Sequence, residues 1–366
     1  MYTNKHITFY INSLNAGGAE RVLSNIANYW ADKNLIISIV TVSGEKSFYM
    51  LNDKINLIQM GLKLESKNVL YKLYNHYNRI KNLIKIMQKN KTDILISFMT
   101  TNNFSATISA VILKIPVIIS ERNIPYTYTK SFIWHILYKL IYPKADYIVV
   151  QTQQIAEYFY SFCNSRKIKI IYNPLNIKLS TAQARKRENI ILNVSRLEFQ
   201  KGHDLLISAF SLIRDRNWKL VIIGEGSRKN RLINQIQEKK LEKYVSILGL
   251  VKNISDYYAS ASLFVLSSRY EGFPNVLCEA MASGLACISF NCPTGPSVII
   301  KHNINGHLVE SENTYKLAES INLLINNNEE RKRLGNNAKG IINEVNIDKI
   351  MQHWDKLIEK LIDKYS

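Results

Sequence analysis

The chain has 366 residues, of which 46% are hydrophobic and 21% are charged, and its formal net charge at pH 7 is +19. This length suits two domains that each bury a core, and this composition excludes a disordered chain. The sequence shows neither a signal peptide nor a run of about eighteen apolar residues, so we expect neither secretion nor a membrane-spanning helix.

Cysteine and histidine spacing indicates a reduced, cytoplasmic setting and no bound metal. The sequence contains no His-Glu-x-x-His and no Cys-x-x-Cys motif. Its cysteines also lack the paired spacing of a disulfide framework. They are Cys163, Cys278, Cys287 and Cys292.

Positive charge is concentrated in the first half, where residues 1–176 contain 21 Lys and Arg but only 9 Asp and Glu. This excess favours a polyanionic partner, either a nucleic acid or an anionic membrane surface that carries a lipid pyrophosphate. A solvated basic surface without such a partner is the alternative.

The first half alternates short apolar strands with helical stretches, which is typical of a parallel doubly wound sheet. A helix is expected to begin soon after Gly18 and to continue through Trp30. The pattern ends near Asn173, and the polar, basic segment 179–188 is predicted to link two domains. The predicted strands are Ile7–Ile11, Ile36–Val42, Ile55–Gln59, Ile94–Phe98, Val117–Ser120, Tyr147–Gln151 and Ile168–Ile171.

A basic amphipathic helix is predicted over residues 67–89. Such a helix can lie on an anionic bilayer, or it can cover a core with its apolar side, and the sequence leaves both open. An aromatic and basic cluster further along the chain favours the membrane, because such residues prefer the headgroup region. The apolar side of the helix consists of Leu70, Leu73, Tyr74, Tyr77, Ile80, Leu83, Ile84 and Met87. Its basic side includes Lys67, Lys72, Arg79, Lys81, Lys85 and Lys89. The aromatic and basic cluster consists of Lys130, Phe132, Trp134, Tyr138, Lys139, Tyr142 and Lys144.

The second half repeats the alternation, so a second parallel sheet is expected. Its predicted strands are Ile190–Val194, Leu220–Ile223, Val245–Leu248, Leu263–Leu266 and Ala286–Phe290. Its predicted helices are Gly202–Arg214, Ser227–Lys239, Asn253–Ala259, Pro274–Ser283 and Thr314–Asn326, and a last helix is predicted over Asn346–Lys364.

Residues 271–279, EGFPNVLCE, carry the strongest chemical signal. They follow an apolar strand, turn at Gly272 and start a helix at Pro274, so they lie at the sheet edge where open α/β sheets bind ligands. Backbone N–H groups in the first helical turn can hold an anion, with Glu271 and Glu279 beside them. The alternative is an ordinary strand-to-helix turn with a capping acid, which the complete string disfavours.

This string resembles the Glu-x7-Glu signature of the family 4 glycosyltransferases, which are retaining enzymes with the GT-B fold. Residues 195–202, SRLEFQKG, are similar to that family's Gly/Ser-Arg-Leu-x-x-x-Lys-Gly element, and residues 17–21, GGAER, are similar to its glycine-rich acceptor-side loop. The resemblance implies an α/β protein with two Rossmann-like doubly wound parallel-sheet domains that face each other across a cleft. It implies an acceptor-binding domain over 1–176, a nucleotide-sugar-binding domain over 177–345, and a helix over 346–366 that crosses back to the N-terminal domain. The absence of an Asp-x-Asp motif argues against the metal-dependent GT-A type.

The resemblance assigns the donor site to the second half. Arg196 and Lys201 would clamp the diphosphate of a nucleoside diphosphate sugar and balance the charge of the leaving group. Glu279 would accept hydrogen bonds from the ribose hydroxyls, and Glu271 would hold hydroxyls of the donor sugar. The other predicted donor-binding residues are Gly18, Gly224, Leu250, Val251, Phe273, Pro274, Asn275 and Val276.

The first half is predicted to bind the acceptor, with glycines that let the backbone approach the reacting groups closely. Many relatives carry a histidine near the end of the strand at Ser120, whereas this chain has Glu121 and Arg122 there. In the family this histidine is associated with the donor sugar and the transition state, and Glu121 or Arg122 is predicted to take over part of its role. With Glu271, Arg196 and Lys201, these two residues form the predicted catalytic set. The predicted acceptor-binding residues are Gly17, Gly18, Arg21, Thr100, Thr101 and Asn102.

The expected activity is retaining transfer of a hexose or N-acetylhexosamine from a nucleoside diphosphate sugar, UDP rather than GDP, to a lipid-linked glycan. The expected pathways are O-antigen, capsule or glycoprotein glycan biosynthesis. We expect the enzyme to need no cofactor or metal and to act on the cytoplasmic face of the inner membrane. A nucleotide-sugar epimerase of the same fold is one alternative. A nucleic-acid-binding module is another, and the absence of a recognised nucleic-acid motif counts against it.

Overall fold

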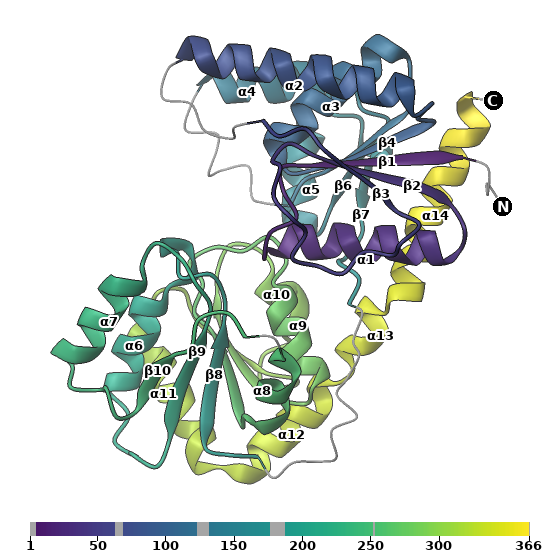
Figure 1. The fold of residues 1–366 in the computed structure, drawn as a ribbon. Coiled ribbons are helices and arrows are strands. Elements are labelled where there is room, and N and C mark those ends of the chain that lie inside the picture. The colour runs from purple at the N-terminus through teal and green to yellow at the C-terminus, as the bar shows by residue number, and fades with distance from the viewer. Residues whose placement is uncertain (1–4, 63–68, 123–131, 176–186, 252, 366) are drawn as a thin grey trace. The chain divides into compact units, whose positions relative to one another are not determined.

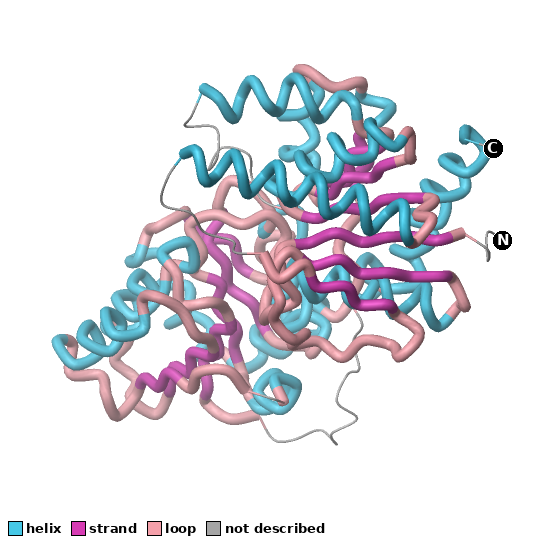
Figure 2. The backbone as a smooth tube through the Cα atoms, turned by 45° about the horizontal axis from the view of Figure 1, so that its top comes forward, coloured by secondary structure: helices cyan, strands magenta, loops and turns pink. Residues whose placement is uncertain are grey.

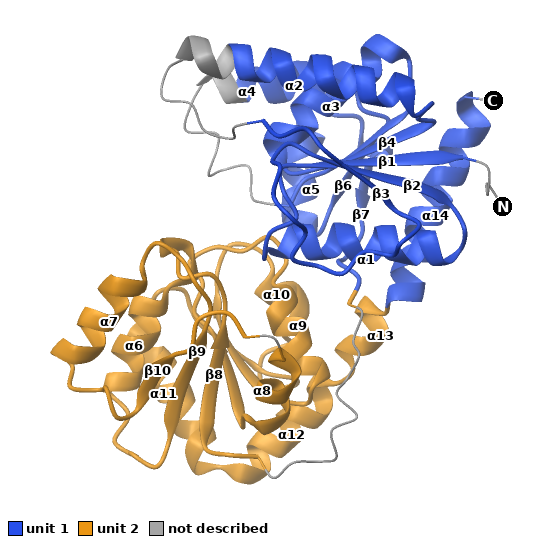
Figure 3. Ribbon diagram, viewed as in Figure 1, with its two compact units in different colours: residues 1–174, 347–366 blue, residues 175–346 orange. Residues whose placement is uncertain are grey.

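The structure, a computed structural model, describes residues 5–62, 69–122, 132–175, 187–251 and 253–365 (Figure 1). The chain divides into two compact units, one formed by Met1–Pro174 with Ile347–Ser366 and the other by Leu175–Asn346 (Figure 3). Residues 179–186 of the predicted linker lie outside the described residues.

The first unit contains a seven-stranded parallel sheet with the order β3-β2-β1-β4-β5-β6-β7. Helices cover both of its faces: α1 and α14 lie on one face, and α2, α3, α4 and α5 on the other (Figure 2). The strand order reverses between β1 and β4, which is where open α/β sheets bind ligands. The elements are β1 (His6–Ile11), α1 (Gly18–Asp32), β2 (Ile36–Thr41), β3 (Asn56–Gln59), α2 (Val69–Lys89), β4 (Ile94–Phe98), α3 (Thr100–Leu113), β5 (Val117–Ser120), α4 (Phe132–Ile141), β6 (Tyr147–Val150), α5 (Gln153–Tyr160), β7 (Ile168–Ile170) and α14 (Ile347–Tyr365).

The last helix, α14, belongs to the core of the first unit. Its Trp354 lies with its ring centroid 6.4 Å from that of Trp30 in α1 and 6.4 Å from that of Phe98 in β4. The indole N–H of Trp30 donates to Asp355 Oδ1 at 2.7 Å. Burial of such large aromatic side chains contributes strongly to stability, so the two ends of the chain form one core.

The second unit contains a six-stranded parallel sheet with the order β10-β9-β8-β11-β12-β13. Its five predicted strands are all present, because strands of a sheet covered on both faces are almost continuously apolar. The elements are β8 (Ile190–Val194), α6 (His203–Ser211), β9 (Lys219–Ile223), α7 (Lys229–Glu238), β10 (Val245–Ile247), α8 (Ile254–Ser260), β11 (Leu263–Leu266), α9 (Asn275–Ala282), β12 (Ala286–Asn291), α10 (Pro296–Ile299), β13 (His307–Glu310), α11 (Thr314–Asn326), α12 (Asn328–Ala338) and α13 (Ile341–Val345).

The sequence did not predict β13 or α12. The strand β13 is a four-residue edge strand, and edge strands carry a weak apolar signal. The helix α12 has the sequence NEERKRLGNNA, which contains no apolar stripe, and it buries Leu334, Gly335 and Ala338. Asn327 marks its start, since the Asn327 side chain accepts a hydrogen bond from the Glu330 N–H at 2.9 Å.

The predicted faces of α2 and α4 need correction. Tyr74 and Tyr77, expected on the apolar side of α2, are 60% and 59% exposed, whereas Arg79, expected on the basic side, is only 6% exposed. Tyr138 and Tyr142, expected at a membrane, are fully buried among core aromatics. The rest of the prediction for α2 is confirmed where side chains are described, since Leu83 and Met87 of the apolar side are fully buried. Periodicity gives the general direction of a helix face and does not decide the burial of single residues at its border. Lys67 and Lys130 lie outside the described residues, as do the side chains of Leu70, Lys72, Leu73, Phe132 and Trp134.

Within the described parts of the chain, every helix is too short or too polar to span a bilayer.

Candidate functional site

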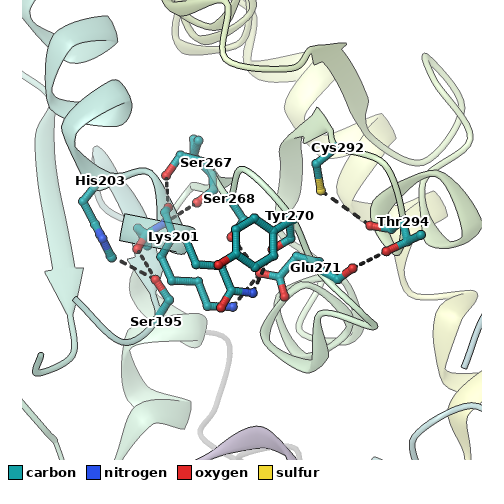
Figure 4. A network of polar contacts seen from close by, with 12 residues as sticks. Ser195, Lys201, His203, Ser267, Ser268, Tyr270, Glu271, Cys292 and Thr294 are labelled. Carbon is teal, nitrogen blue, oxygen red and sulfur yellow. Dashed lines mark hydrogen bonds and ion pairs between the residues drawn. The ribbon is translucent and has the colours of Figure 1, made fainter. Parts of the chain in front are cut away.

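Two loops of the second unit meet at the carboxyl edge of its sheet, one after β8 and one after the neighbouring strand β11. They bring together Lys201 and Glu271, whose Nζ and Oε1 atoms lie 2.6 Å apart and whose side chains are 14% and 6% exposed. Ser268 Oγ donates to the same carboxylate oxygen at 2.6 Å (Figure 4). An ammonium and a carboxylate are therefore paired largely out of water, where their interaction is strong.

Hydrogen bonds between the two loops hold this pair in place. Gln200 Nε2 donates to Tyr270 O at 2.9 Å, and Ser267 Oγ donates to Lys201 O at 3.0 Å. Gly202 has a φ of 62°, and a Cβ atom there would lie 2.0 Å from Ser267 O. Only glycine lets the two loops approach this closely.

Arg269, which is not among the predicted site residues, adds further contacts between the two loops. Its guanidinium donates to both carboxylate oxygens of Asp204, at 2.9 and 2.8 Å, and its Nε donates to Glu312 at 2.9 Å. It also covers the Phe199 ring, 4.0 Å from the ring centroid. The hydrogen bonds with Asp204 raise the pKa of Arg269. This bidentate pairing fixes the orientation of the Arg269 guanidinium. No sequence motif predicts the pairing, because Arg269 and Asp204 are distant in sequence.

A buried histidine orients the first residue of the SRLEFQKG element. Ser195 Oγ lies 2.9 Å from His203 Nε2 (Figure 4). It also lies 3.3 Å from Asn193 Oδ1. His203 is 1% exposed, and burial lowers its pKa to about 4, with a further contribution from Lys201. His203 is therefore neutral near pH 7 and acts through hydrogen bonding rather than charge.

The remaining predicted donor-side residues surround this edge. Arg196 is exposed directly after Ser195. Gly224 has a φ of 154°, and a Cβ atom there would lie 1.9 Å from Ser195 O, so this glycine permits a close backbone crossing. Leu250 is 57% exposed and Val251 is half-buried, both just beyond β10.

The helix α9 begins at Asn275, one residue later than predicted, because Pro274 has a ψ of 92° and forms the N-cap. Phe273, Pro274 and Asn275 are buried, and Val276 is half-buried. Glu279, on the second turn of α9, is half-buried, and its Oε2 accepts a hydrogen bond from Tyr258 at 3.0 Å. The N-terminal end of α9 thus lies beside Glu271 at the sheet edge, where helix amides can bind an anion.

The loop after β12 contacts the backbone of Glu271. This loop is not part of the predicted site. The Thr294 hydroxyl donates to Glu271 O, and Cys292 Sγ contacts Thr294 O at 3.5 Å (Figure 4). Burial raises the pKa of Cys292 to about 12, and the Glu271 carboxylate adds to this shift. The thiol therefore stays protonated, and its role is to support the loop.

In the first unit, the glycine-rich loop leads into α1, and Gly17 is the N-cap residue of this helix. Tyr49, which the sequence analysis did not select, holds Gly17 through two hydrogen bonds: its hydroxyl accepts from Gly17 N–H at 3.1 Å and donates to Gly17 O at 2.8 Å. A Cβ atom on Gly17 would lie 2.1 Å from the Glu20 carboxylate. Gly18 and Arg21 follow in the first turn of α1.

The prediction that Glu121 acts directly on a substrate is corrected by its burial. The Glu121 side chain is fully buried at the end of β5, and it accepts hydrogen bonds from Thr100 Oγ1 at 2.8 Å and from the Tyr142 hydroxyl at 2.5 Å. Thr100 and Asn102, predicted to bind the acceptor, are also buried, with exposed fractions of 3% and 0%. Thr101 is half-buried. A buried carboxylate needs such partners, so Glu121 ties β5 to α3 and to the 3-10 turn Tyr142–Lys144 that follows α4.

Arg122, next to Glu121, is held at the carboxyl edge of the first sheet. Its guanidinium donates to Asn173 Oδ1 and lies 4.3 Å from the Phe98 ring centroid. Burial lowers the pKa of Arg122 to about 9. It therefore remains a cation near pH 7, close to the strand-order reversal that marks the ligand edge of this sheet.

Among the described residues, no group of three or more His, Cys, Asp or Glu side chains could hold a metal ion. Arg196, Lys201 and the amides of α9 are the groups of the second unit that suit a phosphorylated ligand.

Comparisons with known proteins define the class of this molecule. Residues 16–179 match the model described as Glycosyltransferase Family 4, and residues 178–341 match the model described as Glycosyl transferases group 1. HepE of Anabaena, solved in complex with UDP and glucose, is 18% identical and superposes with a TM-score of 0.79 over 98% of this chain and 100% of its own. The fold is that of a glycosyltransferase with two Rossmann-like domains, the GT-B fold.

The chain belongs to glycosyltransferase family 4. It is 30% identical, over 97% of its length and 98% of the relative, to "GalNAc-alpha-(1->4)-GalNAc-alpha-(1->3)-diNAcBac-PP-undecaprenol alpha-1,4-N-acetyl-D-galactosaminyltransferase" of Campylobacter jejuni. It is 26% identical, over 94% of its length and 96% of the relative, to the amylovoran biosynthesis glycosyltransferase AmsD of Erwinia amylovora. The predicted family and fold are thereby confirmed.

Proposed function

We propose that this enzyme transfers an N-acetylhexosamine or hexose from a UDP-sugar, with retention of anomeric configuration, to a lipid-linked glycan of cell-surface polysaccharide or glycoprotein synthesis. The observation that carries the proposal is the Lys201–Glu271 pair, held at 2.6 Å beside the start of α9. The Campylobacter relative, named for an undecaprenol-diphosphate acceptor, supports the acceptor class. The UDP complex of HepE supports the nucleotide.

The pair suits the charge changes of sugar transfer without a metal. An ammonium has three N–H donors, so Lys201 can bond Glu271 and a phosphate oxygen at the same time. Arg196, exposed beside it, can bond the same diphosphate in bidentate fashion. The Glu271 carboxylate keeps acceptor capacity for hydroxyls of the donor sugar. Lys201 and Arg196 together offset the negative charge that develops on the leaving diphosphate.

In the proposed reaction, the bond from the sugar C1 to the phosphate oxygen breaks while the acceptor oxygen bonds C1 from the same face. The leaving phosphate takes the proton of the acceptor hydroxyl, so no enzyme nucleophile is needed, in contrast to a retaining glycosidase. The enzyme contributes by positioning the reactants and by stabilising charge.

A thermal-shift panel with UDP, GDP and their sugars tests the donor. A ligand that binds only the native state at about 100 times its dissociation constant stabilises by roughly 2.7 kcal/mol, and this raises the melting temperature by several degrees. We expect such a shift with UDP and UDP-N-acetylhexosamine and none with GDP. The opposite ranking would refute the nucleotide assignment.

The acceptor requires a separate measurement. The enzyme, the selected UDP-sugar and undecaprenyl-diphosphate-linked glycans should yield an extended lipid-linked product. Conversion of the UDP-sugar into a second UDP-sugar without any acceptor would instead indicate an epimerase. The anomeric coupling constant of the product, read by NMR, decides between retention and inversion.

We further propose that the first unit docks on the anionic cytoplasmic face of the inner membrane through α2, α3 and α4. The helix α3 lies beside both α2 and α4 (Figure 1). The described sequences of these three helices contain no Asp or Glu. Their exposed cations, among the described side chains, are Lys81, Lys85, Lys89 and Lys139, and their exposed apolar residues are Tyr74, Tyr77, Val111, Ile112, Ile136 and Leu140. Basic and apolar side chains together favour the headgroup region of an anionic bilayer.

Charge reversal at Lys81 and Lys85 tests this docking. Each lysine near an anionic surface contributes about 1 kcal/mol, and reversal also adds repulsion, so Lys81→Glu/Lys85→Glu should weaken binding to phosphatidylglycerol vesicles at least about 30-fold. Lys239→Glu/Lys243→Glu, which makes the same charge change at exposed positions of the second unit, is the control. Equal loss in both variants in a vesicle sedimentation assay would exclude a docking surface on these helices.

A further inference from the structure

The tyrosine that reaches Glu279 comes from another helix. Tyr258 lies on α8 and is 3% exposed, and its hydroxyl donates to Glu279 Oε2 at 3.0 Å. The same hydroxyl lies 3.5 Å from Val276 O, one turn earlier on α9. Its ring centroid lies 6.2 Å from that of the buried Phe264 of β11, so the ring is held between the helix and the sheet.

This contact restricts the rotation of the Glu279 side chain. Glutamate has three side-chain torsions, and its terminal torsion is broad and nearly two-fold. Glu279 is half-buried on the second turn of α9, the helix that begins shortly after the ligand edge of the sheet. A hydrogen bond from a buried phenol fixes the rotation of the carboxylate, and hydrogen bonds to charged acceptors are stronger than neutral ones.

A fixed carboxylate is what recognition of a vicinal diol requires. Two neighbouring hydroxyls can both donate to one carboxylate only if its plane has the correct orientation. Carboxylate oxygens have about four lone-pair sites, so the bond to Tyr258 leaves acceptor capacity for both hydroxyls. A site built to bond hydroxyls also discriminates strongly against a ligand that lacks them, because its polar groups then remain unpaired.

We infer that Tyr258 is a positioning residue that orients Glu279 for the two ribose hydroxyls of the donor nucleotide, and that it sets the preference for ribonucleotides over deoxyribonucleotides. This inference rests on the proposed function, because it requires a nucleoside diphosphate in the second unit with its ribose at Glu279. Tyr258 does not touch the nucleotide and acts only through the carboxylate.

Calorimetric titration of the full chain with UDP and with 2′,3′-dideoxy-UDP provides the test. Tyr258→Phe removes only the hydroxyl and keeps the ring against Phe264. We expect this variant to bind UDP about 5- to 10-fold more weakly than the wild type, the loss typical of one intramolecular hydrogen bond, and to bind dideoxy-UDP within about twofold of the wild type. Tyr257→Phe, the same change at the neighbouring half-buried tyrosine, should alter neither affinity.

A double-mutant cycle supplies a second readout. In a Glu279→Gln background, Tyr258→Phe should cost less than about twofold in UDP affinity, since the group that it orients has changed. Equal losses for UDP and dideoxy-UDP in Tyr258→Phe would show a general packing role and overturn the inference. Undiminished UDP affinity would also overturn it.

The wild-type titrations separate these outcomes from a failure of the proposed function. A wild-type enzyme that binds neither UDP nor GDP refutes the donor assignment itself. A wild-type enzyme that binds UDP and dideoxy-UDP equally well keeps the donor but removes the ribose from Glu279, and the inference about Tyr258 is then wrong.

Discussion

Gly202→Ala should lower the melting temperature of the second unit by about 10 °C or more, the largest stability effect that we expect from one added methyl group. Gly202 has a φ of 62°, a left-handed conformation that costs alanine about 1–2 kcal/mol. The new Cβ atom would also lie 2.0 Å from Ser267 O, a backbone atom that cannot rotate away. The loop that carries Glu271 must therefore shift, and transferase activity should fall with stability.

Gly61→Ala is the matched control for this prediction. Gly61 has a φ of 64°, almost the same backbone conformation, but a Cβ atom there would meet no heavy atom within 4 Å. Its alanine variant should show only the conformational destabilisation and lose about 2–8 °C in differential scanning calorimetry. Similar melting temperatures for the two variants would mean that the loops of the second unit are not packed as tightly as described.

Glu271→Gln should reduce transfer about 100- to 1000-fold, as expected for loss of a charged group that acts on the transition state. The amide can still accept hydrogen bonds from Lys201 and Ser268, so the loop geometry should persist. Under the proposed assignment, Glu271 contacts the sugar and not the nucleotide. The affinity for UDP should therefore change less than about threefold while kcat falls.

Glu329→Gln is the control, since it makes the same chemical change in an exposed ion pair with Lys332 on α12 of the second unit. Surface pairs of this kind contribute less than about 1 kcal/mol, and this variant should transfer sugar at the wild-type rate. Steady-state kinetics and UDP titration of both variants provide the measurement. Full activity of Glu271→Gln would remove Glu271 from the site, whereas equal loss of UDP affinity and activity would assign it to the nucleotide.

Local sequence predicted most of the fold because the relevant signals are short-range. Parallel strands such as Leu263–Leu266 are apolar without interruption, since both faces of their sheet are covered. Glycine and proline mark the turns at the ends of these strands. The amphipathic pattern also predicted the position of α2 and the burial of Leu83 and Met87 on its core side, but not the burial of every residue along it. Buried Arg79 and exposed Tyr77 reverse what their polarity suggests.

The candidate site divides in the same way. Lys201, Glu271 and Glu279 belong to contiguous motifs, and the sequence identified them without any structure. Glu121 also matches the pattern expected of a site residue, because it directly follows a strand at the ligand edge. Its burial involves a hydrogen bond from Tyr142, in the 3-10 turn that follows α4, and no local pattern encodes this contact.

The sequence by itself determined the family, the two parallel sheets and the charged motifs, because each of these depends on spacing along a short stretch of chain. Only the tertiary structure decided which groups support them: Arg269 on Asp204, Tyr258 on Glu279, Tyr49 on Gly17 and α14 in the first core. These contacts join residues from about twenty to more than three hundred positions apart. Hydrogen bonds act only at contact distance, so such partners become apparent only when the fold brings them together.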